Sequence, residues 1–186
     1  MKVIVAVTGA SGIIYGVRLV EELNKKNVET HVIFTEAAKK TAEYELKDAL
    51  KRVKASSKFI YSENEIDAPP ASGSNFFHAM IIAPCSIRTL GSIANGIADN
   101  LVTRAALVQL KERRSLILLL RETPISTIDI LNMLKVSIAG ATIMPASPAF
   151  YHNPNTIDDL VNFIVGKILD LLGIQHNLYK KWKEKS

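Results

Sequence analysis

The stretch Met1-Lys2-Val3-Ile4-Val5-Ala6-Val7-Thr8-Gly9-Ala10-Ser11-Gly12 decides the fold. Residues 2–7 form a continuous apolar run, as in a strand that is buried on both faces of a parallel sheet. Small residues then form a turn over 8–12. Apolar residues recur at helical spacing over 13–26, and a second apolar run occupies 29–34. The sequence therefore predicts a strand, a helix and a second parallel strand.

The rest of the chain repeats this alternation. Further strands are predicted at 79–83, 115–120 and 141–144, alternating with helical patterns near 36–51, 88–112, 126–138 and 155–172. Such alternation is typical of an α/β protein with a Rossmann-like, doubly wound parallel sheet flanked by helices. A length of 186 residues without repeats or linkers predicts a single domain over 1–186, with 174–186 as a basic C-terminal tail.

The composition narrows the class of protein. Hydrophobic residues make up 48% and charged residues 22%, the balance of a globular chain. No segment reaches the roughly 20 apolar residues of a membrane helix, and the first apolar run continues into residues 8–12 without a signal-cleavage region. The single cysteine, Cys85, excludes an intrachain disulfide and predicts a reducing, cytoplasmic compartment.

The net charge of +5 is compatible with nucleic acid, but the basic residues are scattered. They cluster only at 111–114 and 180–183, and no nucleic-acid motif accompanies them. An anionic small molecule is the simpler partner.

Ligands of open parallel sheets bind at the carboxyl ends of the strands, where helix N-termini favour anions. At the first strand end, the turn over 8–12 lets backbone amides approach a phosphate or an aromatic ring. The turn lacks the G-x-G-x-x-G pattern, and it is equally consistent with an ordinary strand-to-helix connection. Thr35, after the second strand, has the position of a helix N-cap, and capping alone can explain it.

Later strand ends carry more polar groups. Residues 83–89 gather hydroxyls and Arg88 at a helix start, a grouping that suits a phosphate. Arg121 and Glu122 directly follow a strand too apolar to be exposed, and charges at such a place favour function over structure. Residues 144–151 form a proline-rich loop that either delivers aromatic side chains to the site or caps the core.

No metal site is predicted. The four histidines, which are His31, His78, His152 and His176, show no ligand spacing with Cys85 or with each other. Cys85 itself reads as a small buried hydrophobe rather than a nucleophile, because no catalytic histidine or acid can be assigned to it.

Short motifs are spread over almost the whole length of the chain. In chain order they are Thr8-Gly9-Ala10-Ser11-Gly12, Tyr15-Gly16, Ala68-Pro69-Pro70-Ala71-Ser72-Gly73-Ser74, Pro84-Cys85-Ser86, Thr89-Leu90, Asp99-Asn100-Leu101, Arg104-Ala105-Ala106, Leu110-Lys111-Glu112-Arg113-Arg114, Arg121-Glu122-Thr123-Pro124, Pro148-Ala149-Phe150-Tyr151 and Asp158-Asp159-Leu160. One such motif would mean little, but many in one order are specific. In these motifs the chain resembles the UbiX-type flavin prenyltransferases, formerly described as aromatic-acid decarboxylases.

The resemblance implies a flavoprotein, typically a dodecamer, with FMN at a junction between subunits and dimethylallyl phosphate as second substrate. The positions that match the family's FMN contacts are Gly9, Ala10, Ser11, Thr35, Ser86, Ile87, Arg88, Thr89, Arg104 and Arg121. Those that match the dimethylallyl phosphate site are Tyr151 and Lys167, with Lys111, Arg121, Glu122 and Glu45 nearby.

The implied reaction joins the dimethylallyl group to N5 and C6 of reduced FMN, and the prenylated FMN passes to a UbiD-type decarboxylase. Lys111, Arg121 and Lys167 would stabilise the leaving phosphate, so no metal is required. Proton movements would involve Ser11, Glu45 and Glu122, with the departing phosphate as a further base.

Three positions depart from the family pattern. The family often has an aromatic residue where Ile66 stands and Arg where Lys167 stands, and Arg88 replaces a smaller residue of some members. Lysine supplies a cation without a bidentate fork, which predicts weaker phosphate binding. The sequence does not choose between a phosphate and a diphosphate donor.

Two other functions compete with this one. A flavin-dependent decarboxylase of peptidyl cysteine or phosphopantothenoylcysteine has the same general fold, but its catalytic histidine and Pro-Ala-x-x-Asn-Thr loop are not found in this sequence. An FMN-binding electron-transfer or carrier protein would explain the FMN positions. It would leave Lys111, Glu122, Tyr151 and Lys167 without a purpose.

Overall fold

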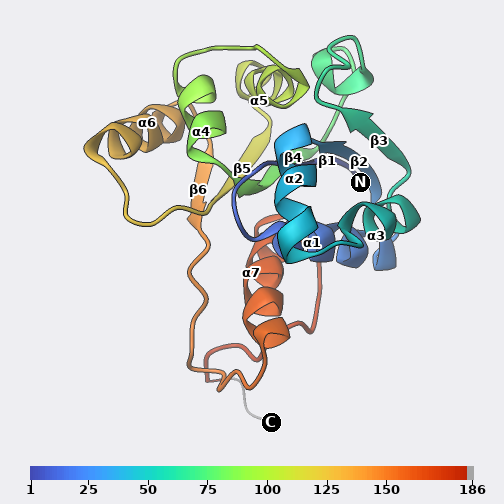
Figure 1. The fold of residues 1–186 in the computed structure, drawn as a ribbon, viewed down its shortest axis with the longest axis vertical. Helices are drawn as coiled ribbons and strands as arrows, with labels where there is room; N and C mark the ends of the chain where they lie inside the picture. The colour runs from blue at the N-terminus through green and yellow to red at the C-terminus, as the bar shows by residue number, and fades with distance from the viewer. Residues whose placement is uncertain (184–186) are drawn as a thin grey trace. The chain divides into compact units, whose positions relative to one another are not determined.

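The computed structural model describes residues 1–183 (Figure 1). The strands are β1 (Lys2–Val7), β2 (Glu29–Phe34), β3 (Phe59–Ser62), β4 (Ala79–Cys85), β5 (Ser115–Leu120) and β6 (Thr142–Pro145). The helices are α1 (Ile13–Lys25), α2 (Glu36–Glu45), α3 (Ala49–Ser56), α4 (Ile87–Ala94), α5 (Leu101–Lys111), α6 (Thr127–Ile138) and α7 (Ile157–Leu171), with a 3₁₀ turn at Pro69–Ala71. Two compact units result: Met1–Pro145, and a second that begins at Ala146. One domain over the whole chain remains a prediction.

The first unit contains a parallel six-stranded sheet in the order β3-β2-β1-β4-β5-β6. The chain winds outward from β1 to β3 on one side, then crosses to β4 and winds outward on the other. The strand order therefore reverses between β1 and β4, the position at which ligands bind in doubly wound sheets. The predicted fold class is confirmed.

Two layers of helices cover this sheet. On one face, Ile4, Met80 and Leu118 pack in a single core cluster with Leu90 of α4 and Leu101 of α5. Helix α6 packs against α4, and α1 packs against β1, β2 and β4. In the view of Figure 1, α4 and α5 lie above the strands and α1 lies below them.

Polar side chains fix where the helices begin. The hydroxyl or amide oxygen of the N-cap residue accepts a backbone N–H in α2, α4, α5, α6 and α7, where the caps are Thr35, Ser86, Asn100, Ser126 and Thr156. Three of these five helices, α5, α6 and α7, have a complete capping box. The predicted N-cap at Thr35 is confirmed.

The sequence prediction missed one strand and joined elements that the structure separates. Strand β3 was not predicted because it is a four-residue edge strand with only partial burial. The helical pattern over 88–112 divides into α4 and α5, because Gly96 adopts a positive φ of 69° and Asn100 caps a new helix. The pattern over 36–51 likewise divides at Leu46 into α2 and α3.

The second unit contains α7 and the segments on either side of it. Thr156 caps α7, and Asp159 accepts the backbone N–H of Thr156 in return. Among residues 1–183, every helix is too short or too polar to cross a membrane.

Candidate functional site

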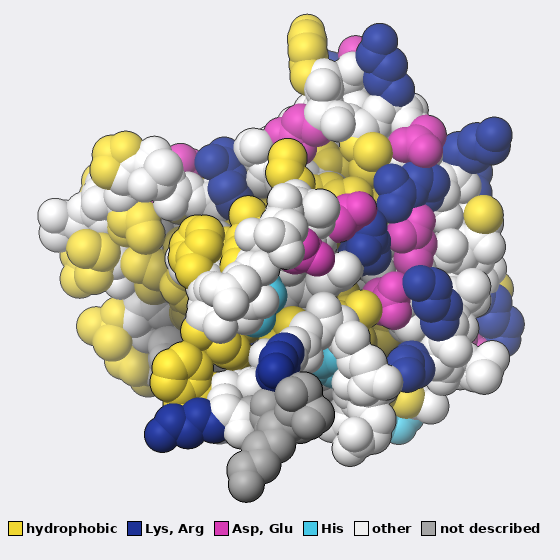
Figure 2. Space-filling view, turned by 90° about the horizontal axis from the view of Figure 1, so that it is seen from below, with side chains coloured by type: hydrophobic (Ala, Val, Ile, Leu, Met, Phe, Trp, Pro, Cys, Tyr) yellow, Lys and Arg dark blue, Asp and Glu magenta, His cyan; other side chains and the backbone are white. Residues whose placement is uncertain are grey.

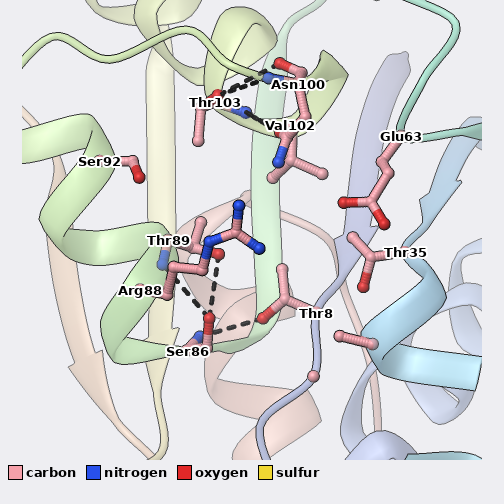
Figure 3. Close-up of a pocket in the computed structure, with 12 residues that line it drawn as sticks. Thr8, Thr35, Glu63, Ser86, Arg88, Thr89, Ser92, Asn100, Val102 and Thr103 are labelled. Carbon is pink, nitrogen blue, oxygen red and sulfur yellow. Dashed lines mark hydrogen bonds between the residues drawn. The ribbon is translucent and has the colours of Figure 1, made fainter. Parts of the chain in front are cut away.

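A cavity of about 190 Å³ lies where β1, β2 and β4 end, at the reversal of strand order (Figure 3). Its lining residues are Thr8, Gly9, Thr35, Ala37, Glu63, Ser86, Arg88, Thr89, Ser92, Asn100, Val102 and Thr103. Sites that enclose a whole drug-sized ligand usually measure about 300–1,000 Å³. A larger ligand must therefore extend beyond this cavity.

Hydroxyl groups on the cavity floor are held by a continuous hydrogen-bond chain. Thr8 Oγ1 donates to the carbonyl of Pro84 at 2.7 Å and accepts the amide of Ser86 at 3.0 Å. Ser86 Oγ lies 3.0 Å from Thr89 Oγ1 and accepts the amide of Thr89. These bonds join the end of β1 to the start of α4, so the hydroxyls are fixed before a ligand arrives (Figure 3).

Charged groups of both signs line the same cavity. Figure 3 shows the Arg88 guanidinium between the Ser86 hydroxyl and the start of α5. Arg88 pairs with Asp99 at 3.3 Å, but its side chain is 78% exposed, so the ion pair leaves it accessible. On the opposite side, the Glu63 carboxylate accepts the amide of Glu36 at 2.8 Å, at the N-terminus of α2.

A second group of residues surrounds the turn between β1 and α1. Gly12 has a φ of 98° and no side chain to cap α1, and Glu45 takes that role. Its Oε2 accepts the amides of Gly12 at 2.8 Å and Ile13 at 3.1 Å. The carboxylate is thereby held at the helix N-terminus, where negative charge is favoured.

Arg121 reaches the same turn from the end of β5. A Cβ placed on Gly12 would lie 3.9 Å from Arg121 Cγ and 2.9 Å from the Tyr15 ring. Burial raises the pKa of Tyr15, and the positive charge of Arg121 partly opposes this. Within residues 1–183, the buried Nε of Arg121 has no hydrogen-bond partner. A buried guanidinium N–H without a partner destabilises the folded protein, unless a bound ligand accepts a hydrogen bond from it.

The structure brings together only part of the predicted FMN set. Gly9, Thr35, Ser86, Arg88 and Thr89 line the cavity. Other members of the set lie outside that lining: Ala10 is buried, Ser11 is exposed, Ile87 packs against the core cluster, and Arg104 lies 3.5 Å from the carbonyl of Ala71.

Lys111 and Glu122 lie near opposite ends of strand β5. Lys111 ends α5 just before β5 begins, whereas Arg121 and Glu122 follow the last residue of β5. Six residues of strand separate them, or about 20 Å at the usual rise of a strand. Within one chain the structure therefore does not bring Lys111 to Glu122.

The remaining predicted residues, Tyr151 and Lys167, belong to the second unit. The Tyr151 ring meets the rings of Phe163 and Trp182 edge to face, with centroids 6.0 and 5.1 Å apart. Lys167 Nζ lies 3.7 Å from Asp170 Oδ2 and its side chain is half-exposed.

Sequence reasoning missed several lining residues. Asn100 and Thr103 belong to a capping box, a pattern that could have located them together at a helix start. Glu63 gave no such signal, because it follows β3, the strand that was not predicted.

Cys85 is confirmed as a buried hydrophobe. Its side chain is inaccessible, and burial raises its pKa to about 12, so the reactive thiolate is scarce at neutral pH. Within residues 1–183, no group of three or more His, Cys, Asp or Glu side chains could hold a metal ion.

The model of the Flavoprotein family matches residues 1–169, so fold and site together define a flavoprotein. Flavin prenyltransferase UbiX of Saccharolobus solfataricus is 48% identical over 185 residues, which cover 98% of this chain and 92% of that protein. The protein of the same name from Aquifex aeolicus is 44% identical, with 98% of each chain covered. The chain belongs to the flavin prenyltransferase UbiX family.

Solved structures agree with this assignment. The crystal structure of AnUbiX (PadA1) in complex with FMN and dimethylallyl pyrophosphate matches with a TM-score of 0.96 and 40% identity, covering 100% of this chain and 98% of that chain. The dodecameric FMN-dependent UbiX-like decarboxylase from Escherichia coli matches with a TM-score of 0.95 and 43% identity, covering 99% of this chain and 100% of that chain. The peptidyl-cysteine decarboxylase EpiD, at 20% identity and a TM-score of 0.61, shares the fold alone.

Proposed function

We propose that this chain transfers a dimethylallyl group from dimethylallyl phosphate to N5 and C6 of reduced FMN, producing the cofactor of UbiD-type decarboxylases. The observation that carries the proposal is the 48% identity to a flavin prenyltransferase over 98% of the chain. The family relative in complex with FMN and dimethylallyl pyrophosphate supports the same pair of ligands.

The cavity at the strand ends fits the phosphate end of FMN. The hydroxyls of Ser86 and Thr89 share one hydrogen bond, so one of the two O–H groups remains free to donate to a phosphate oxygen, and the accessible guanidinium of Arg88 offers further donors. The carboxylate of Glu63, which accepts the amide of Glu36, repels a phosphate. A phosphate in this cavity should therefore bind on the side of Arg88. The cavity is too small for the whole cofactor, so the ring must lie outside it.

The turn around Gly12 fits the reacting end of the site. The unpaired Arg121 Nε can donate to an anion there, and its positive charge would stabilise the departing phosphate. Reduced FMN, when bound, supplies the electron-rich ring that accepts the prenyl group. The backbone amides of Gly12 and Ile13 both donate to Glu45 Oε2, so Oε1 is the oxygen that would exchange a proton.

Glu122 and Ser11 complete the proposed acid–base set. Both are exposed, at the end of β5 and in the turn after β1. The Glu122 carboxylate accepts the amide of Thr123, which holds it beside the strand end. Ile87 and Ala10 would contribute backbone rather than side-chain contacts, because their side chains are apolar.

We also propose that the site is shared between copies of the chain. Lys111 cannot reach the Glu122 of its own chain, so a site that uses both must take them from different subunits. The relative from Escherichia coli is dodecameric, which supports a similar assembly here. Arg104 and Lys111 lie on the same helix, and both would enter the site of a neighbour.

We place the protein in the cytoplasm, because its one cysteine is an unpaired thiol in the core. The donor phosphate would be recognised by Tyr151 and Lys167, together with Arg121 and Lys111. The family resemblance implies this role for Tyr151 and Lys167.

A reconstitution experiment tests the function. The protein is incubated without oxygen with reduced FMN and dimethylallyl phosphate. It is then removed by filtration, and the filtrate is added to a UbiD-type decarboxylase prepared without cofactor. Decarboxylase activity should appear. A filtrate made without dimethylallyl phosphate is the control, and equal activity in both filtrates would favour a flavin carrier instead.

A further inference from the structure

The residues after α7 fold back onto that helix. We call residues 174–182 the C-terminal strap. A Cβ placed on Gly166 would lie 2.6 Å from the Tyr179 ring and 2.8 Å from the His176 ring. Glycine at this position of α7 therefore permits the strap to lie directly against the helix, next to Lys167.

Asp170 joins the strap to α7. Its Oδ2 accepts the hydroxyl of Tyr179, and its Oδ1 lies 3.1 Å from His176 Nε2. The amide of Leu178 donates to His176 Nδ1 at 3.1 Å. Because Nδ1 is an acceptor, the imidazole proton lies on Nε2 and is donated to Asp170. Both oxygens of this carboxylate thus hold the strap.

The same carboxylate contacts the proposed phosphate-binding cation. Lys167 Nζ lies 3.7 Å from Asp170 Oδ2, the oxygen that accepts Tyr179. Burial alone would raise the pKa of Asp170, but the hydrogen bonds from Tyr179 and His176 and the positive charge of Lys167 lower it. Asp170 therefore keeps its negative charge and restricts a side chain that has four rotatable bonds.

The strap also reaches Tyr151. Its Trp182 ring meets the Tyr151 ring edge to face at 5.1 Å. Strap residues and the loop 151–153 enclose a cavity of about 280 Å³, which Lys180, Lys181 and Trp182 line on the strap side. Lys167 and Tyr151 are thus in contact with one folded-back segment, through Asp170 and Trp182.

We propose that Asp170 is a positioning residue, which docks the C-terminal strap and so orients Lys167 and Tyr151 toward the phosphate of the prenyl donor. This inference rests on the proposed function. Asp170 itself touches neither substrate in this assignment. Its removal should change donor binding, while FMN binding and the chemical step remain.

Three variants separate the parts of this proposal. Asp170→Asn removes the charge that holds Lys167 but keeps the side-chain size. Tyr179→Phe weakens strap docking and leaves the Lys167 pair intact. Asp158→Asn, another exposed carboxylate near the start of α7, is the control. Thermal melting followed by circular dichroism shows that each variant is folded.

Two measurements are made on each variant. Trp182 is the chain's single tryptophan and is 66% exposed in the docked strap, so release of the strap shows as a modest rise in the quenching of its fluorescence by acrylamide. Steady-state kinetics give KM for dimethylallyl phosphate and kcat separately. Asp170→Asn should increase quenching and raise KM for dimethylallyl phosphate about three- to tenfold, which corresponds to the loss of roughly one hydrogen bond. Its kcat and its affinity for FMN should stay within about twofold of the parent values. Tyr179→Phe should increase quenching with a smaller change in KM.

Two results would overturn the proposal. Unchanged quenching in Asp170→Asn would show that Asp170 does not dock the strap. Increased quenching with an unchanged KM would reduce Asp170 to a structural role. If the parent protein forms no product, the proposed function fails separately, and calorimetric titration of dimethylallyl phosphate into the parent and Asp170→Asn replaces KM as the readout.

Discussion

Arg121 and Glu45 bring opposite charges to one backbone turn. Arg121 extends from the end of β5 and has a buried Nε without a partner among the described residues, whereas Glu45 ends α2 and holds the amides of Gly12 and Ile13. The two residues lie 76 positions apart in sequence, and only the parallel sheet places both beside the same glycine. One ligand at this turn can therefore meet both charges: Arg121 can bind its anionic group, and Glu45 can accept or donate a proton.

Substitution of Glu45 by glutamine tests its assignment. Glutamine can still accept the amides of Gly12 and Ile13, so the turn and FMN binding should be preserved, while the proton-accepting oxygen loses its charge. Formation of prenylated FMN should slow by roughly 10²–10⁴-fold, the usual range for a general acid–base group. Product formation is followed by mass spectrometry. A rate within about twofold of the parent would leave Glu45 with a capping role only.

At the scale of elements, the tight contact between α1 and the sheet fixes the site's turn. A Cβ on Gly16 would lie 2.2 Å from the carbonyl oxygen of Ala83 and 2.9 Å from Val7 Cγ2. The helix must therefore lack a side chain at this point to approach β1 and β4. Displacement of α1 would also move Gly12 away from Glu45.

Two glycine-to-alanine variants compare this tightly packed glycine with a helical glycine that has free space beside it. Gly16→Ala should destabilise the protein by about 1–3 kcal/mol through overpacking. Gly91 is also inside a helix, but a Cβ there would meet only Asn132 Nδ2 at 3.6 Å, an ordinary contact. Gly91→Ala should therefore stabilise by up to about 1 kcal/mol. Urea unfolding measures both. Equal free energies of unfolding for the two variants would contradict the role given to Gly16.

Much of the arrangement of elements was predictable, because buried parallel strands are apolar on both faces and leave a strong pattern. The runs at 2–7, 29–34 and 115–120 are strands with those bounds. The edge strand β3 has no such pattern, since it is only half-buried. Contacts between distant segments are invisible to periodicity, so the capping of Gly12 by Glu45 and of Glu36 by Glu63 could not be predicted.

At the scale of the whole molecule, α6 has an inverted distribution of side chains. Asp129 and Asn132 face inward and are buried, whereas Ile128, Leu131 and Ile138 are 71%, 53% and 77% exposed. Ile130 and Leu134 extend the same apolar surface. Figure 2 shows hydrophobic side chains gathered on the left of the view, the side on which α6 lies in Figure 1. Such a surface is typical of a contact between subunits.

A charge on this surface should disrupt assembly. Leu131→Lys would bury an unpaired ammonium in an apolar contact, so we expect a smaller assembly by light scattering. Ile157, which is also apolar and is 79% exposed, lies on α7, so Ile157→Lys is the control and should keep the parent mass. An unchanged mass for Leu131→Lys would show that α6 does not form the contact.

Complementation tests whether the site is shared. Lys111→Ala and Glu122→Gln should each lose most activity as separate proteins. Coexpressed in one cell, they should form mixed assemblies in which some sites take Lys111 from one subunit and Glu122 from another. Those sites contain both residues, and activity should return in part. Coexpressed variants as inactive as the separate ones would contradict a shared site.

The mass of the flavin after reaction distinguishes prenyl transfer from flavin binding alone. Purified protein is mixed with reduced FMN and dimethylallyl phosphate without oxygen, and the released flavin is analysed by mass spectrometry. We expect a flavin enlarged by one C5H8 unit, which forms only when protein and donor are both present. Tight binding of FMN whose mass stays unchanged would contradict the transferase assignment and leave a flavin-binding protein in its place.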